Sequence, residues 1–193
     1  TVPGLQKGKT NLVKSARKDV SGKGINVCMQ LKNMEQPVIA AGFDFVDGRV
    51  RVKDALEKRG ISHVLTNVSG SLRTNIKVLD PDTGIMTELN ERGSAVREES
   101  VQEICHKICQ VMDELDEGSI LTVNGSAPVG VPTDTYRRLI EEAKKRKIFT
   151  ILDASGELLR QGVKAKPELI KPNLDELQEL LGRKLETVEE VAE

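Results

Sequence analysis

The sequence LIKPNLDEL at residues 169–177 places a lysine, an amide and a carboxylate where a strand is expected to turn into a helix. Pro172 ends the apolar strand, because proline has no N–H to donate to a sheet ladder. Asn173 suits a helix N-cap, and Glu176 three residues later fits its reciprocal partner in a capping box. Open α/β sheets bind ligands at the carboxyl ends of their strands, so these side chains are candidates for a binding site. On this stretch alone, helix capping explains Asn173 and Glu176 better than ligand binding does.

A second candidate is Gly22-Lys23-Gly24, which opens directly onto a helix expected from Ile25. Glycines let the backbone approach an anion closely, and the free N–H groups of a helix N-terminus face that anion. Lys23 adds a positive charge. The spacing excludes a Walker A loop, which needs other glycine positions and a Ser or Thr after the lysine. A plain tight turn explains the three residues at least as well.

Arg73 and Asp153 each admit a functional and a structural interpretation. Arg73 opens a predicted β-hairpin and could reach over a site to bind a phosphate through two parallel hydrogen bonds. A solvated edge-strand arginine is the commoner case. Asp153 ends a predicted strand, where catalysis is possible, but Asp-Ala-Ser-Gly equally suits a turn with an N-cap, which we favour. His63 and His106 are isolated in the sequence and receive no role.

Strand-like and helix-like patterns alternate along most of the chain. Apolar runs predict strands at residues 37–42, 61–66, 119–123, 148–152 and 169–170. Apolar residues at helical spacing predict helices at residues 25–31, 51–59, 101–115, 133–143, 158–163, from 173 and from 188. We therefore expect an α/β fold with a mostly parallel sheet, right-handed crossovers and helices on both faces. Residues 73–90 instead predict a β-hairpin and residues 12–20 an exposed strand, which together would form a small β appendage.

Composition bounds the class of protein. The 193 residues carry a net charge of −1, with 38% hydrophobic and 31% charged residues, which is typical of a globular domain. This charge argues against an extended nucleic-acid or anionic-membrane surface, and no apolar run approaches the roughly 20 residues that cross a bilayer. Without paired secretory cysteines or a signal-peptide pattern, we expect a cytoplasmic protein. Cys105 and Cys109 lie on the apolar side of a predicted helix, which favours buried thiols over a metal site.

Taken in order, five segments resemble the ribokinase-like (PfkB-type) carbohydrate kinases, and within them the 1-phosphofructokinase and tagatose-6-phosphate kinase branch. They are GKGINV at 22–27, RTNIK at 73–77, GSAPVGVP at 125–132, LDASGE at 152–157 and LIKPNLDEL at 169–177. Each segment is modest alone, but five in the family's order are hard to obtain by chance. The resemblance implies a ribokinase-like, Rossmann-like α/β core with a β-sheet lid, and a homodimer formed through the lids.

The resemblance also implies an activity and a role for each matching residue. The activity is ATP-dependent phosphorylation of a ketohexose phosphate, of the fructose 1-phosphate or tagatose 6-phosphate class, to the bisphosphate. The residues expected to hold the sugar phosphate are Gly22, Lys23, Gly24, Asn26, Arg73 and Ser126. Those expected to face the nucleotide are Lys171, Asn173 and Glu176, with Glu176 binding Mg²⁺ through water. Phosphoryl transfer asks a protein mainly for positioning and charge stabilisation, and these residue types supply both.

Two motifs of that family do not occur in these 193 residues. One is an Asn-Pro-x-x-Asp stretch that contacts sugar hydroxyls, and the other is a late Gly-Ala-Gly-Asp motif that supplies the general base and the anion hole. We therefore expect residues 1–193 to form a single incomplete kinase domain without its C-terminal part, with lid strands around residues 10–20 and 73–91 and no catalytic residue. Loss of the base costs roughly 10²–10⁴-fold in rate and loss of the hole roughly 10²–10³-fold, so we expect this stretch alone to be inactive.

Two further departures leave the substrate open. Residues 42–48 read GFDFVDG where the family has a glycine pair, and Ser21 stands where the branch has another glycine. One alternative is a ribokinase-like kinase of an unphosphorylated sugar or nucleoside, which would need neither Lys23 nor Arg73. Another is a shortened, non-catalytic homologue that binds sugar phosphates or dimerises through its lid.

Overall fold

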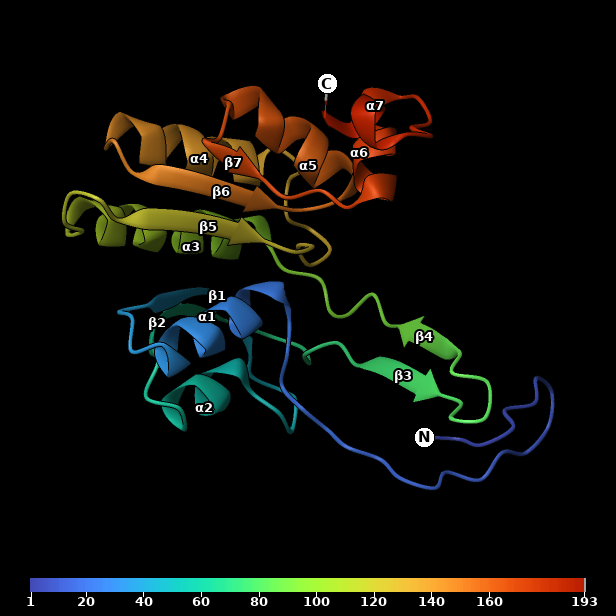
Figure 1. The fold of residues 1–193 in the computed structure, drawn as a ribbon. Coiled ribbons are helices and arrows are strands. Elements are labelled where there is room, and N and C mark those ends of the chain that lie inside the picture. The colour runs from blue at the N-terminus through green and yellow to red at the C-terminus, as the bar shows by residue number, and fades with distance from the viewer. Residues whose placement is uncertain (193) are drawn as a thin grey trace.

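The computed structural model describes residues 1–192, in which helices and strands alternate as the sequence predicts (Figure 1). The strands are β1 (Ile39–Phe45), β2 (Ser62–Val68), β3 (Asn75–Leu79), β4 (Met86–Asn90), β5 (Ile120–Asn124), β6 (Phe149–Asp153) and β7 (Leu169–Ile170). The helices are α1 (Lys23–Asn33), α2 (Val52–Glu57), α3 (Glu98–Asp113), α4 (Thr135–Lys145), α5 (Gly156–Gly162), α6 (Leu174–Leu181) and α7 (Val188–Ala192), with a 3₁₀ turn η1 (Val163–Ala165).

Two parallel sheets organise the fold. β1 pairs with β2 in register from Ile39–Ser62 to Phe45–Val68, and β6 lies between β5 and β7. Every strand pair in these two sheets is parallel, which confirms the predicted α/β class. Within residues 1–192, no hydrogen-bonded ladder joins the two sheets. Helix α1 contacts both β1 and β5, so it links the sheets through side-chain packing.

Helices cover both faces of the β1–β2 sheet. One face packs against α1 and α2 through a core that includes Ala40 and Leu56. The other packs against α3 through Phe45 and Val101. Leu56 is 1% exposed, and burying such a side chain contributes about 1.5–3 kcal/mol.

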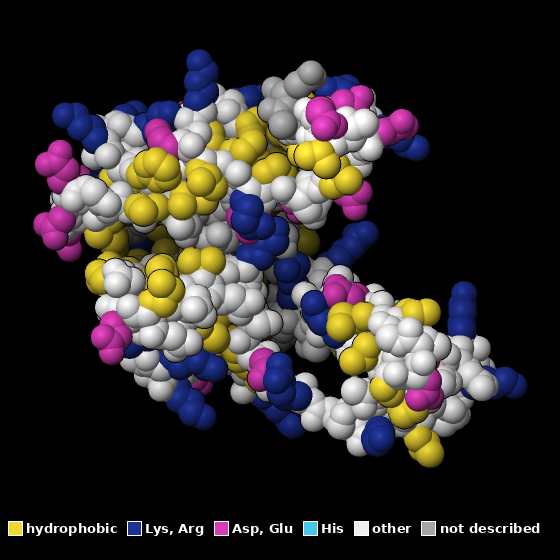
Figure 2. Space-filling model, viewed as in Figure 1, with side chains coloured by type: hydrophobic (Ala, Val, Ile, Leu, Met, Phe, Trp, Pro, Cys, Tyr) yellow, Lys and Arg dark blue, Asp and Glu magenta, His cyan; other side chains and the backbone are white. Residues whose placement is uncertain are grey.

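The β5–β7 sheet has one covered face and one exposed apolar face. Helices α4 and α5 cover the first face, where Leu152 is fully buried. Side chains alternate along a strand, so Ile120 and Phe149 point to the opposite face, as does Leu169, which pairs with Ile151. These three side chains are 55%, 43% and 44% exposed. Figure 2 shows hydrophobic side chains exposed at the surface over these strands.

The predicted hairpin is present, but the predicted strand at residues 12–20 is wrong. β3 and β4 pair antiparallel and project away from the core (Figure 1). Residues 11–22 form no strand. Leu12 and Val13 are 85% and 64% exposed, so burial supplies little free energy to order this segment against a neighbour. The lid around residues 10–20 therefore lacks the strand that we expected there.

The N-terminal residues bind the hairpin near its turn instead. Val2 donates its N–H to the carbonyl of Leu79 at 2.9 Å, and Gly4 donates to Oδ1 of Asp80 at 3.0 Å. Asp80 is 6% exposed and also accepts hydrogen bonds from the backbone of Leu5 and Asp82. One carboxylate that accepts backbone N–H groups thus organises a region for which we predicted strand pairing.

The three cysteines are free thiols. Cys28 is buried, and Cys105 and Cys109 are half-buried on α3, which agrees with the core-thiol interpretation. Burial raises the pKa of the Cys105 thiol above its ordinary value. The described residues contain no group of three His, Cys, Asp or Glu side chains placed to hold a metal ion. Among the helices of residues 1–192, none combines the length and apolar content that a membrane span requires.

Candidate functional site at the carboxyl ends of the strands

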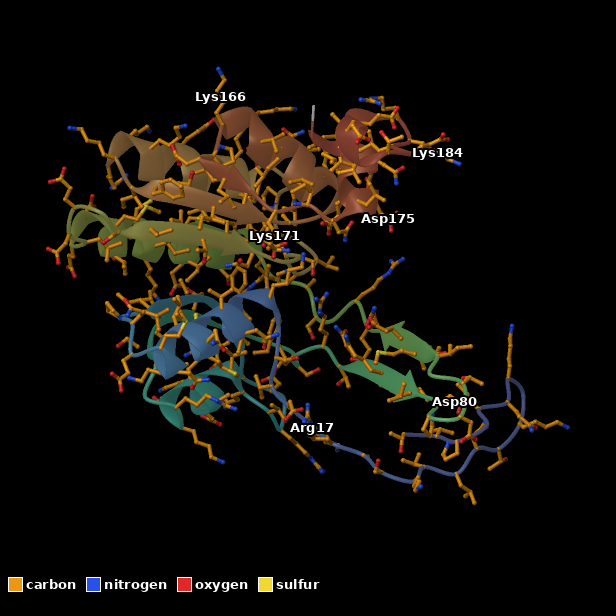
Figure 3. The ribbon with its side chains drawn as sticks, viewed as in Figure 1. Arg17, Asp80, Lys166, Lys171, Asp175 and Lys184 are labelled. Carbon is orange, nitrogen blue, oxygen red and sulfur yellow. The ribbon has the colours of Figure 1, made fainter. Side chains whose placement is uncertain are left out.

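The carboxyl ends of β5, β6 and β7 lie beside the N-termini of α1 and α6. β5 ends at Asn124, β6 ends at Asp153, and Lys171 follows β7 directly. The N–H of Gly125 donates to the carbonyl of Asp153 at 2.7 Å, which holds the first two strand ends side by side. Figure 3 shows Lys171 at this end of the sheet. Polar groups from distant segments therefore gather at the edge where α/β folds bind ligands.

Asp153 lies at the centre of this group. Its Oδ1 is 2.8 Å from Nζ of Lys23, and its Oδ2 is 3.2 Å from Nζ of Lys171. Glu176 adds a second carboxylate, with Oε1 at 3.8 Å from Nζ of Lys23. The hydrogen bond that Lys23 donates to Asp153 raises the pKa of Lys23 above its ordinary value, against the opposing effect of burial. Lys23 therefore stays charged in the pH range of a cell.

The predicted capping box at the start of α6 is confirmed. Oδ1 of Asn173 accepts the N–H of Glu176 at 2.8 Å, and Oε2 of Glu176 accepts the N–H of Asn173 at 2.9 Å. The cap uses Oε2 of Glu176, whereas Oε1 is the oxygen near Lys23. Asn173 and Glu176 thus cap the helix and also line the candidate site.

A helix follows the glycine segment as predicted, but α1 begins at Lys23 rather than at Ile25, so Lys23 and Gly24 belong to its first turn. Gly22 is the N-cap and has no side chain, so the first N–H groups of the helix have no capping partner from it. A side chain at Gly24 would contact Asn124 at 3.7 Å, so the turn lies against the end of β5. Asn26 lies on the exposed first turn of the helix, where its N–H donates to Gly22.

Arg73 reaches the same region from the base of the hairpin. Its Nη2 donates to Oγ of Ser126 at 2.9 Å. Gly125, with φ of +78°, turns the chain there, and a Cβ at that glycine would contact Cβ of Lys23 at 3.6 Å. The short Gly125-Ser126 turn therefore lies between Lys23 on one side and Arg73 on the other.

Most of the predicted site residues thus come together, although they are spread over more than 150 positions of the sequence. Lys23, Lys171 and Glu176 surround Asp153, and Arg73 contacts Ser126. In Figure 2, Lys and Arg side chains gather near the centre of the view, between the two sheets.

The N-cap predicted within Asp-Ala-Ser-Gly is present, because Ser155 is the N-cap of α5 and Asp153 is the last residue of β6. This local role does not account for Asp153 itself, whose side chain is 12% exposed and binds two lysines. The sequence did contain a signal for part of this pairing. Asp153 ends a buried strand and Lys171 follows the next strand, and the carboxyl ends of neighbouring parallel strands share one sheet edge.

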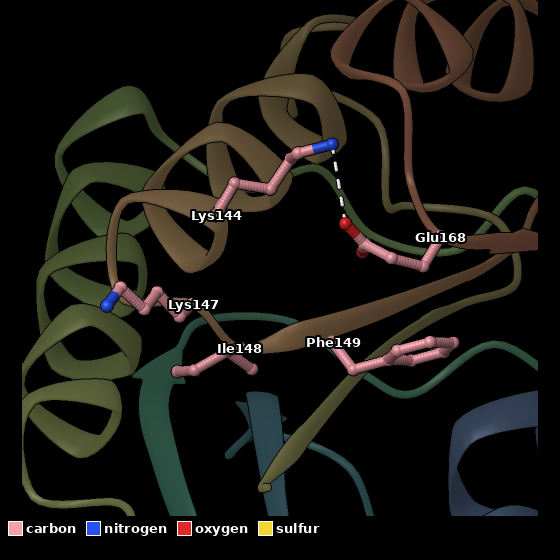
Figure 4. A pocket seen from close by; sticks show the side chains of 5 residues that line it. All are labelled: Lys144, Lys147, Ile148, Phe149 and Glu168. Atoms are coloured by element: carbon pink, nitrogen blue, oxygen red, sulfur yellow. Dashed lines mark ion pairs between the residues drawn. The ribbon is translucent and has the colours of Figure 1, made fainter. Parts of the chain in front are cut away.

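A separate hollow lies at the other end of β6, away from these residues. Its lining consists of Lys144, Lys147, Ile148, Phe149 and Glu168 (Figure 4). Nζ of Lys144 lies 3.4 Å from Oε1 of Glu168 across it. It adjoins the amino end of the strand, the opposite end from the one where open α/β sheets bind ligands.

Comparison with known protein families and curated proteins supports a kinase relationship. A family model described as pfkB family carbohydrate kinase matches residues 1–193. A 1-phosphofructokinase of Bacillus subtilis is 34% identical over 169 residues, which cover 88% of this chain and 54% of the relative. A tagatose-6-phosphate kinase of Staphylococcus epidermidis is 32% identical over 179 residues, or 91% of this chain and 56% of the relative. The chain thus spans about half the length of the curated relatives it matches.

Solved structures show the same fold. A crystal structure of phosphofructokinase-2 from Escherichia coli in complex with fructose-6-phosphate superposes with a TM-score of 0.84, at 24% identity, over 99% of this chain and 62% of that chain. A possible 1-phosphofructokinase from Thermotoga maritima gives a TM-score of 0.82, also at 24% identity, over 99% of this chain and 61% of that chain. These likenesses confirm the ribokinase-like architecture expected from the sequence.

Proposed function

Because this chain belongs to the pfkB family of carbohydrate kinases, we propose that the whole protein transfers the γ-phosphate of ATP to a ketohexose phosphate. The group of cations Lys23, Arg73 and Lys171 at one sheet edge is the observation that carries the proposal. Two anionic substrates that react with each other need such charges to offset their mutual repulsion. Relatives named 1-phosphofructokinase and tagatose-6-phosphate kinase support fructose 1-phosphate or tagatose 6-phosphate as the class of acceptor.

In this proposal, the glycine turn and the base of the hairpin hold the sugar phosphate. Backbone N–H groups of residues 22–24 face it at the helix N-terminus, and Lys23 adds a charge. Arg73 binds the phosphate group through its guanidinium, which forms two parallel hydrogen bonds with an oxyanion. Asn26 and Ser126 offer neutral hydrogen bonds to the same substrate, since both are exposed beside these cations.

The proposed nucleotide site comprises Lys171, Asn173 and Glu176. Lys171 is 66% exposed in its side chain, so its ammonium group is accessible to a phosphate while it pairs with Asp153. Mg²⁺ binds proteins through one or two carboxylates and keeps several waters, and Glu176 offers the oxygen that its helix cap does not use. When bound, Mg²⁺ would neutralise charge on the transferring phosphate. Glu176 would hold it through water, and Lys23 would keep that carboxylate oriented.

A panel of acceptors tests this function in the full-length protein. With MgATP, we expect ADP release with fructose 1-phosphate or tagatose 6-phosphate and a kcat/KM at least about 10²-fold lower with fructose, ribose or adenosine. The reason is that hydrogen bonds to charged groups contribute about 1.5–3 kcal/mol each. A preference for an unphosphorylated acceptor would favour the neutral-substrate kinase. Calorimetric binding of a sugar phosphate without any ATP turnover would favour a non-catalytic binding protein.

Exposed apolar residues on the hairpin favour a second copy of the chain as a partner. Ile76 and Leu89 pair across β3 and β4 on one face and are 48% and 56% exposed. Paired apolar residues left in solvent are typical of protein interfaces. We therefore include a homodimer through the hairpins, and a cytoplasmic location, in the proposed function. Light scattering should give a dimer mass for the natural protein and a monomer mass for Ile76→Lys, whereas an unchanged dimer would contradict this interface.

A further inference from the structure

One carboxylate binds two lysines that come from distant parts of the chain. Oδ1 of Asp153 accepts from Nζ of Lys23 at 2.8 Å, and Oδ2 lies 3.2 Å from Nζ of Lys171. The Asp153 side chain is 12% exposed, whereas the lysine side chains are 43% and 66% exposed. The buried member of the group is therefore the carboxylate, and the members that a ligand can reach are the ammonium groups.

We propose that Asp153 is a positioning residue, which fixes Lys23 and Lys171 side by side so that sugar phosphate and nucleotide meet in one geometry. This inference rests on the proposed function, because it assigns the two lysines to the two substrates. Asp153 itself touches neither substrate in this proposal. It acts through the lysines, each of which binds a different oxygen.

The backbone around Asp153 suits this task. Its carbonyl accepts the N–H of Gly125 at 2.7 Å, which ties β6 to the turn beside Lys23. The N–H of Lys171 donates to the carbonyl of Leu152 at 3.0 Å, so the chain that carries this lysine is fixed to the same strand. Long lysine side chains have high rotamer freedom, and a rigid acceptor restricts where their ammonium groups lie.

An amide cannot replace the carboxylate in this arrangement. Asparagine has one acceptor oxygen, and its NH₂ group would point at an ammonium group that also only donates. Asp153→Asn therefore releases one of the two lysines. It also removes the negative charge that offsets the repulsion between the two ammonium groups. Asp153→Glu keeps both acceptor oxygens and displaces them by one methylene group.

A positioning role and a simple charge-balancing role for Asp153 predict opposite effects of Asp153→Asn on the steady-state kinetics. If Asp153 only offset positive charge, Asp153→Asn would raise the local positive potential and lower the KM of both anionic substrates. If Asp153 positions the lysines, the same change lowers kcat/KM despite the more favourable charge. We expect a fall of about 10²-fold, because small misplacements of binding groups cost about that much in rate.

The decisive experiment compares Asp153→Asn with Asp113→Asn in the full-length protein. Asp113 pairs with Arg146 at 2.7 Å on the surface and lies outside the site, so it controls for loss of a carboxylate. We expect Asp113→Asn to keep the kcat/KM of the natural protein. Unchanged or improved kcat/KM in Asp153→Asn would overturn the inference.

Lysine order gives a readout that does not require kinase activity. With ¹³C-labelled lysine, NMR relaxation should show the side-chain ends of Lys23 and Lys171 ordered in the natural protein and in Asp153→Glu, and at least one of them mobile in Asp153→Asn. Lysine order that is the same in all three proteins would overturn the inference even if activity fell. If the natural protein phosphorylates no sugar phosphate, the proposed function fails, and the relaxation measurement still tests the pairing. If Asp153→Asn does not fold, Asp153→Glu decides: a lower kcat/KM supports the inference, and an unchanged kcat/KM overturns it.

Discussion

Nη2 of Arg73 donates a hydrogen bond to Oγ of Ser126 at 2.9 Å, which joins the base of the β-hairpin to the turn after β5. The two residues lie 53 positions apart, and neither is buried. An exposed hydrogen bond of this kind contributes only about 0.5–1.5 kcal/mol, so it does not hold the fold together. Its importance is that it directs a guanidinium toward the turn that Lys23 also contacts.

Replacing Arg73 by alanine should weaken binding of the sugar phosphate. We expect the KM for the phosphorylated acceptor to rise about 10–100-fold, because a charge-assisted hydrogen bond contributes about 1.5–3 kcal/mol. The KM for ATP should stay nearly constant. Steady-state kinetics of the full-length protein measure both values. Arg59→Ala is the control, since Arg59 is also exposed but follows α2 far from this turn. An acceptor KM that is unchanged in Arg73→Ala would indicate an unphosphorylated substrate.

Two substitutions of Glu176 separate its structural role from its metal role. Gln serves in a capping box as Glu does, so Glu176→Gln should leave the free energy of unfolding within about 0.5 kcal/mol. Glu176→Ala removes the cap and should cost about 0.5–2 kcal/mol. Both variants should need about 10–100-fold more Mg²⁺ for half-maximal activity, because groups that orient metal-bound waters have effects of that size.

Asp175→Asn provides the control for Glu176. Asp175 is the exposed neighbour on the first turn of α6, so it shares the helix dipole but not the cap. Its substitution should leave the Mg²⁺ requirement unchanged. A Glu176→Gln variant with the natural Mg²⁺ dependence would rule out the metal role and leave helix capping alone.

Glu168 should make the stability of the fold dependent on acid pH. Its Oε2 accepts hydrogen bonds from Oγ1 of Thr150 at 2.6 Å and from the Thr150 N–H at 2.8 Å, and these bonds lower the pKa of Glu168 from 4.5 to about 2. A carboxyl whose pKa is depressed in the folded state stabilises that state above the unfolded pKa and loses the effect as pH falls. The contribution of Glu168 should therefore disappear between pH 4.5 and about 2.

Thermal unfolding at a series of pH values tests the role of Glu168. The natural protein and Glu168→Gln should differ most above pH 4.5 and converge as the pH approaches about 2. A difference in melting temperature between the two proteins that stays constant across this pH window would show that the carboxylate has no pH-linked stabilising effect.

Gly130 should tolerate no side chain. It has φ of +95°, and a Cβ there would lie 2.1 Å from the carbonyl oxygen of Val96. Gly130→Ala should cost more than the roughly 1–3 kcal/mol of backbone strain alone. Gly84→Ala is the matched control, since Gly84 has φ of +71° but open space around it. Urea denaturation should show a larger loss of unfolding free energy for Gly130→Ala, and equal losses would mean that the Val96 carbonyl moves freely.

Local sequence signals predicted much of the fold and part of the site. The capping box of Asn173 and Glu176 was readable because both partners lie within one helical turn. The hairpin was readable because β3 and β4 alternate around a dense cluster of turn residues. Alternation of strands and helices fixed the parallel pairing, since parallel strands need a crossover between them.

Long-range contacts set the limit of such predictions. Lys23 and Asp153 are 130 positions apart, and no local pattern around Asp153 indicates a partner. The strand predicted at residues 12–20 failed for a similar reason, because Leu12 and Val13 fit a strand but stay exposed and pair with no strand of the described residues 1–192. A sequence window shows what a residue could do, whereas tertiary neighbours decide which possibility is realised.

Product analysis tests whether this protein transfers phosphate to a sugar phosphate. The full-length protein would be incubated with fructose 1-phosphate or tagatose 6-phosphate and with ATP labelled in its γ-phosphate, and the products identified by mass spectrometry. We expect a labelled bisphosphate that forms in equal amount with ADP from one of these acceptors. Formation of ADP without a bisphosphate, or no ADP with either acceptor, would contradict it.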